Sequence, residues 1–267
     1  MRVLLISVVL LAACDTYGSG PPNQSPAQFY VANQGSSTIT VFTTDDTGNV
    51  APTLTIAGTN TGLNSTEGIL VDPTGVVLVT NVSPPRILVF AAHAVGDVAP
   101  IASIVGSNTG LVQPKALALD ALGRLYVADA GANSIFIFAY GASGNVAPIG
   151  TISGSNTALS GPAGLGFDVR GRLYVANSST STVTVYPSGA RRNAAPIDTI
   201  TGPNTGLDQP EGVALDPAGR IYVANSAVTS HGYRITVYGA AATGDVAPVA
   251  TLAGNKTGLS VPSHLSF

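Results

Sequence analysis

Three charged side chains occupy matching places in a repeated sequence and are the first candidates for chemistry. Glu67, Lys115 and Glu211 lie 48 residues apart, or twice that distance, and Ala163 and Ser263 occupy the corresponding position in two further repeats. If the repeats form a ring, these positions share one face of it. Two carboxylates and an amine placed together there could bind a polar ligand.

The last repeats add two histidines and a tyrosine to this set. His264 occupies a position that is Gly or Ala in every other repeat, and His231 and Tyr233 lie in a four-residue insertion within residues 226–234. We expect all three on the same face as the charged residues. The alternative is neutral variation at exposed positions.

Five amide or carboxylate side chains recur at the end of one predicted strand. Such side chains either satisfy loop amides or form a polar ring around the opening of the axis. The residues are Asn33, Asn81, Asp129, Asn177 and Asn225.

The elements that position these residues come from a unit that recurs every 48 residues. Tyr30-Val-Ala-Asn33 returns, with small changes, at residues 78–81, 126–129, 174–177 and 222–225. A fixed period of this size is typical of solenoids, propellers and arrays. Within one unit, residues 164–206, four runs rich in β-branched and aromatic residues are separated by Gly, Pro, Asn or Ser, and none has helical periodicity.

The order of these runs predicts an all-β fold, a five-bladed β-propeller of four-stranded antiparallel blades over residues 28–267. Several runs are apolar on both faces, which requires cover on both sides. First strands begin at Gly68, Ala116, Gly164 and Gly212, with small residues at alternate positions near the axis. Residues 263–267 provide a fifth first strand, so we expect the C-terminal strand to close the first blade.

The outermost strands are marked by proline, which lacks a backbone donor and suits a strand start or an edge. We expect the fourth strand of each blade to begin at one of Pro52, Pro100, Pro148, Pro196 and Pro248.

The unit resembles the NHL repeat. Pro210-Glu-Gly-Val-Ala-Leu-Asp-Pro-Ala-Gly-Arg-Ile-Tyr-Val-Ala-Asn225 is close to the family pattern, and the resemblance covers almost everything after residue 27. It implies a β-propeller with a loop-rich face. The unit of 48 residues is longer than is usual in that family, whose members often have six blades.

Resemblance also suggests an enzyme as the alternative function. Gluconolactonase-type propellers hold a divalent metal on this face with Glu, Asn and Asp, and Glu67 and Glu211 are similar in residue type. Oxygen ligands suit calcium or magnesium. NHL-type lyases use several inward histidines, whereas this chain has only His93, His231 and His264, and we expect His93 on the opposite face. A G-x-S-x-G elbow, an H-E-x-x-H pair and a P-loop are all absent from the sequence.

The N-terminus predicts an export signal followed by a lipid anchor. Residues 1–13 combine Arg2 with a short apolar run, and Leu11-Ala-Ala-Cys14 resembles the lipobox of bacterial lipoproteins. In that family the cysteine becomes the lipidated N-terminus. Cys14 is the only cysteine in the chain, which excludes internal disulfides. Residues 14–27 are rich in Gly, Pro and Ser and are expected to form a flexible tether.

Composition and motifs together predict a location and a class of function. Charged residues are 9% of the chain and the net charge is −3, so no nucleic-acid partner is expected. We expect a protein of the bacterial cell envelope that is anchored through Cys14 and binds or organises a protein, peptide or glycan. The alternative is a metal-dependent lactonase or lyase with its site at the axis opening.

Overall fold

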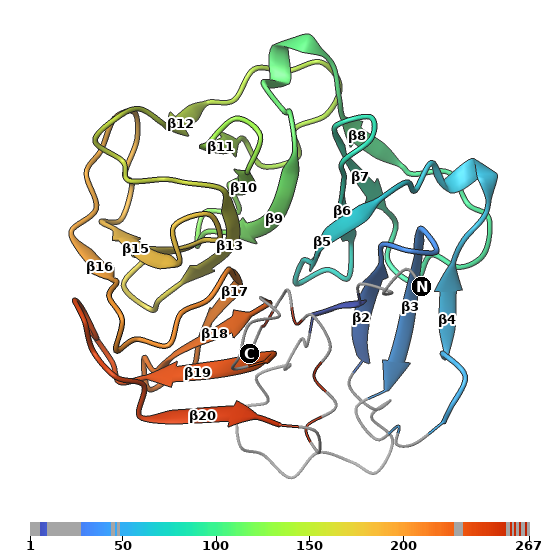
Figure 1. Cartoon of the computed structure of the whole chain (residues 1–267). Coiled ribbons are helices and arrows are strands. Elements are labelled where there is room, and N and C mark those ends of the chain that lie inside the picture. Colours follow the sequence, from blue (N-terminus) through green and yellow to red (C-terminus); the bar gives the residue numbers. More distant parts are fainter. Residues whose placement is uncertain are drawn as a thin grey trace, which may run out of the picture.

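Short runs of β-branched residues, separated by glycine-rich turns, form five antiparallel four-stranded sheets in a computed structural model of the chain. The sheets radiate from a central axis as the blades of a propeller (Figure 1). The structure describes residues 6–9 (backbone only), 28–43, 46, 49–226, 232–254, 257, 259, 262 and 265. The five-bladed, all-β architecture expected from the repeat is confirmed.

Each blade has its innermost strand beside the axis and its second strand next to it. The innermost strands are β1 (Ile6–Val9), β5 (Thr66–Val71), β9 (Pro114–Leu119), β13 (Pro162–Phe167) and β17 (Pro210–Leu215). The second strands are β2 (Gln28–Asn33), β6 (Val77–Asn81), β10 (Leu125–Asp129), β14 (Leu173–Asn177) and β18 (Ile221–Asn225).

The third and fourth strands complete each blade toward the rim. The third strands are β3 (Thr38–Thr43), β7 (Arg86–Phe90), β11 (Ser134–Phe138), β15 (Thr182–Tyr186) and β19 (Arg234–Tyr238). The outermost are β4 (Leu54–Ile56), β8 (Ala102–Ile104), β12 (Gly150–Ile152), β16 (Asp198–Ile200) and β20 (Ala250–Ala253). The prolines expected to begin these last strands lie two residues earlier, in the approach to the rim.

Among the described residues the only helices are two single 3-10 turns in the connections between blades, η1 (Thr59–Thr61) and η2 (Ser107–Thr109). No described helix is long and apolar enough to cross a membrane.

The hydrophobic core lies between neighbouring blades rather than at the axis. Four clusters of buried side chains join the first blade to the second, the second to the third, and so on to the fifth. Tyr174 and Tyr186 are among the largest fully buried side chains. Strands such as β10 and β14 are buried along their whole length, because each blade is covered on both faces.

The strand that completes the first blade differs from the prediction. β1, close to the N-terminus, pairs with β2, and Val8 stands opposite Val31. Leu265 is in no strand, and residues 263, 264, 266 and 267 lie outside the described residues. An apolar, β-branched segment satisfies the open edge of β2 wherever it comes from in the chain, because the hydrogen bonds of the ladder are made by backbone.

Leu252 at the end of the fifth blade is exposed, whereas its counterparts in the other four blades are buried. In the first four blades the last residue of the outer strand bridges the next blade and is buried, as Ile200 does with Gly244. Leu252 occupies the corresponding place on β20, opposite Ile235, yet 51% of it is exposed.

Candidate functional site at the mouth of the axis

Four innermost strands present the charged positions through the same local irregularity. In the ladder between the innermost and second strands, three residues have no paired residue opposite them: Lys115, Ala163 and Glu211. The register of β5 shifts at the corresponding point, beside Glu67. Each is the extra residue of a β-bulge, which redirects a side chain out of the regular alternation. We call Glu67, Lys115 and Glu211 the entrance cluster.

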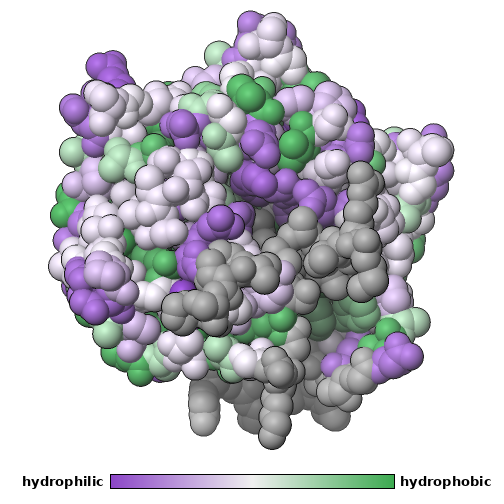
Figure 2. Space-filling model, in the orientation of Figure 1, coloured by the Kyte–Doolittle hydropathy of each residue, from purple (hydrophilic) through white to green (hydrophobic). Residues whose placement is uncertain are grey.

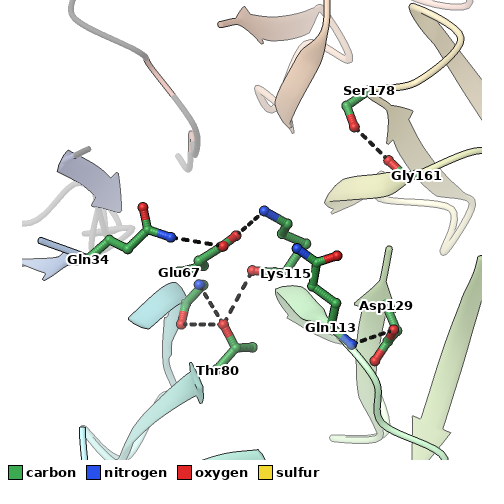
Figure 3. A network of polar contacts seen from close by, with 9 residues as sticks. Gln34, Glu67, Thr80, Gln113, Lys115, Asp129, Gly161 and Ser178 are labelled. Carbon is green, nitrogen blue, oxygen red and sulfur yellow. Dashed lines mark hydrogen bonds and ion pairs between the residues drawn. The ribbon is translucent and has the colours of Figure 1, made fainter. Parts of the chain in front are cut away.

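Lys115 and Glu67 form an ion pair across the boundary between the second and third blades. Lys115 Nζ lies 2.5 Å from Glu67 Oε2, and their side chains are only 20% and 13% exposed. Gln34, in the turn after β2, donates from Nε2 to Glu67 Oε1 at 3.0 Å. Figure 3 shows these three side chains, from three blades, meeting at one point. The predicted meeting of Glu67 and Lys115 on one face is therefore observed.

The backbone beneath this pair is packed too closely for any side chain at Gly68. A Cβ built on Gly68 would lie 2.3 Å from the carbonyl oxygen of Lys115. Thr80 Oγ1 fills the same region, accepting from Gly68 N at 2.7 Å and lying 3.4 Å from Lys115 O (Figure 3). Glycine at this position lets one blade approach the next and sets the position of Lys115.

Glu211 is the member of the cluster whose charge is least balanced by neighbouring groups. It is half-buried, and no described residue forms a hydrogen bond or ion pair with its carboxylate. Burial raises the pKa of Glu211, Lys115 lowers it, and the negative charge of Glu67 raises it again. Glu211 thus shares a bulge position with the other members of the cluster, and the charges of both influence its pKa.

An axial cavity of about 300 Å³ is lined by the strand residues that follow the cluster. Its walls include Ala116, Ala118, Gly164, Gly166 and Gly212, which confirms the expected small residues near the axis. The cavity therefore lies next to the entrance cluster along four innermost strands. On the face seen in Figure 2, hydrophilic residues gather around the centre of the disc.

The recurrent polar residues at the ends of the second strands are engaged with backbone. Asp129 accepts from the amides of Val112, Gln113 and Ala132 at 2.8–2.9 Å. Four of the five side chains are at most 1% exposed, and Asn33 is half-buried. The capping alternative therefore describes Asn81, Asp129, Asn177 and Asn225, which hold the connection between blades.

The remaining candidate residues are dispersed or lie outside the described residues. Tyr233 is half-buried directly before β19, and His93 is exposed in the β7–β8 loop. His231, His264 and Cys14 lie outside the described residues. Among the residues that the structure describes, no group of three or more His, Cys, Asp or Glu side chains could hold a metal ion.

Gln34 is the site residue that sequence reasoning missed. It follows Asn33 directly, where the other repeats have Val82, Ala130, Ser178 and Ser226. That departure from the repeat was the available signal, but nothing in the repeat indicated that the amide would reach Glu67 in the next blade.

Comparison with known proteins supports the fold. A family model described as the NHL repeat matches residues 207–238, which contain β17 to β19. No curated protein matches the sequence.

Three solved structures share the fold at low sequence identity. A functionally unknown protein from Desulfotomaculum acetoxidans is 12% identical, with a TM-score of 0.56 over 84% of this chain and 66% of its own. Virginiamycin B lyase from Staphylococcus aureus, in a catalytically inactive form with quinupristin, is 15% identical, with a TM-score of 0.53 over 80% of this chain and 63% of its own. A chain of a nidogen/laminin complex is 18% identical, with a TM-score of 0.61 over 90% of this chain and 80% of its own. The chain thus spans slightly less than two thirds of the first two proteins.

Proposed function

We propose that this protein is a lipid-anchored binding module of a bacterial cell envelope, which holds a protein, peptide or glycan partner at the mouth of its propeller axis. The observation that carries the proposal is the convergence of Gln34, Glu67 and Lys115, from three blades, next to an axial cavity, with Glu211 at the same bulge position of the fifth blade. Concave sites with a few convergent polar groups are the usual places for ligands.

The arrangement supports binding better than catalysis. Glu67 is already engaged by Lys115 and Gln34, so its carboxylate is held in place by partners within the protein. The metal-dependent lactonase or lyase alternative requires Glu67 or Glu211 to hold calcium or magnesium. Metal analysis of the purified protein, together with its thermal midpoint with and without calcium, tests that alternative separately.

A crosslinking experiment tests the binding function on the full chain in its native host. A photo-reactive amino acid is placed either at Val112 or at Val169. Val112 is 53% exposed and bonds to Asp129 on the entrance face, whereas Val169 is 88% exposed in the turn between β13 and β14. We expect a discrete crosslinked species from position 112 and none from 169. Equal crosslinking at both positions, or none at either, would contradict the proposal.

The lipid anchor has its own test. Support for it comes from Leu11-Ala-Ala-Cys14 and the absence of any other cysteine. A Cys14→Ser variant is expected to lose incorporation of labelled fatty acid and to leave the membrane fraction after processing. Unchanged labelling would remove the anchor from the proposal and leave the binding function standing.

A further inference from the structure

The entrance cluster contains one cation fewer than it has carboxylates. Lys115 is its only cation, and the ammonium is directed to Glu67 at 2.5 Å. Glu211 has no hydrogen bond or ion pair with any described residue. A half-buried carboxylate without a partner has lost part of its hydration and gained nothing in return.

The neighbouring strand places no charged side chain between Lys115 and Glu211. In ring order the residue between them is Ala163, whose buried methyl group cannot pair with a carboxylate. The backbones of β13 and β17 are in direct contact here, because a Cβ on Gly164 would lie 2.8 Å from the carbonyl oxygen of Glu211. That contact holds the backbone of Glu211 in place, and its carboxylate has no partner among the described residues.

Building on the proposed function, we infer that the axial mouth binds a protonated amine or guanidinium group, presented by a lysine or arginine side chain of a peptide partner. Glu211 is the counter-ion for that group, and the Glu67–Lys115 pair forms a fixed wall beside it. The ligand thus supplies the positive charge that the cluster lacks.

The chemistry of the surroundings favours a cation on an aliphatic stem. An anionic ligand would need Lys115, which Glu67 already occupies at 2.5 Å. The adjoining cavity is lined by backbone and by aliphatic side chains that include Leu117, Leu165 and Val213. Lysine and arginine stems pack along such surfaces while their charged ends reach a polar partner.

The test measures binding of defined probes to the full chain. The probes are a glycine-flanked lysine tripeptide with blocked ends, the matched norleucine tripeptide, and glucosamine, which is an amine from a sugar. Binding is followed by calorimetry for the unaltered protein, for Glu211→Gln and for Asp198→Asn. The last variant removes the same charge from the half-buried carboxylate on β16, at the rim.

The expected result is binding of the lysine probe alone, weakened about tenfold or more by Glu211→Gln and unaffected by Asp198→Asn. The inference is overturned by equal binding of the norleucine probe, by no effect of Glu211→Gln, or by no binding at probe concentrations of about 10 mM. Preference for glucosamine would overturn the peptide assignment.

The same variant separates this inference from the function on which it rests. If crosslinking from position 112 persists undiminished in Glu211→Gln, the binding module stands and the cation site does not. If crosslinking is absent in the unaltered protein while the lysine probe binds, the cation site stands without the proposed partner.

Discussion

Val8 of β1 stands opposite Val31 of β2 in the same register in which Ile69 stands opposite Val79 in the second blade. The N-terminal strand β1 therefore occupies the place that the repeat assigns to Leu265. Leu265 itself lines the axial cavity together with Ile69 and its counterparts in the other blades. By its place in the repeat, Leu265 is the residue that would pair with Val31 if β1 were absent.

Removal of residues 1–13 is expected to change the partner of β2. The connection after β20 already has the form seen between the other blades: Thr257 N donates to Gly254 O at 3.1 Å, and Leu259 N donates to Thr257 Oγ1 at 3.3 Å. We expect the C-terminal segment to pair with β2 once the leader is gone, and Leu252 to become buried.

Paired cysteines at positions 31 and 265, with Cys14 replaced by serine, provide the measurement. A disulfide is expected in the chain without residues 1–13 and not in the full chain, because two cysteines must come within bonding reach to be joined. Equal crosslinking in both chains would show that the leader does not control access to β2.

Gly68→Ala is expected to destabilise the ring and displace Lys115. The added methyl carbon would lie 2.3 Å from Lys115 O, so the contact between two blades must open. Such overpacking costs about 1–3 kcal/mol of the free energy of unfolding. Gly239→Ala is the control, because nothing lies within 4 Å of its Cβ position. Urea unfolding of both variants gives the comparison, and equal midpoints would refute the close contact.

Replacement of Asp129 should show how much free energy of unfolding is lost when the backbone amides that donate to it have no acceptor. Its carboxylate accepts from three backbone amides, so Asp129→Ala leaves partly buried donors without this acceptor, at a cost of at most about 1–3 kcal/mol for each such group. Asp129→Asn retains an acceptor of the kind the other blades use and should cost less. Equal unfolding free energies for the two variants would contradict this role.

The raised pKa of Glu211 predicts a pH-dependent gain of stability in Glu211→Gln. Below the pKa that this carboxyl has in the unfolded chain, near 4.5, Glu211 is protonated in both states and the substitution has little effect. As pH rises, the unfolded chain releases the proton first, so the folded protein loses stability until the pKa of its own Glu211 is passed.

The variant lacks that loss, so its advantage in unfolding free energy should be absent near pH 4 and present at pH 7. Each tenfold difference in proton affinity between the folded and unfolded states contributes about 1.4 kcal/mol. Chemical unfolding at the two values of pH is the measurement. An advantage that is the same at both would exclude titration of Glu211 as its cause.

Much of this protein follows from the sequence because the repeat carries local information. Four runs per unit, each bounded by turn residues, specify strands, and the fixed period places Glu67, Lys115 and Glu211 at matching points of a ring. The capping role of Asp129 was also accessible, since such side chains commonly satisfy loop amides.

Tertiary structure alone decided which side chains meet and which strand completes the ring. The bulges that redirect the entrance cluster, and the reach of Gln34 to Glu67, depend on the packing of neighbouring blades. The pairing of Val8 with Val31 depends on a backbone edge that accepts any apolar extended segment. The period of the sequence shows which residues of the repeats are equivalent. Contacts between repeats depend on the distances between neighbouring blades, which the sequence of one repeat does not specify.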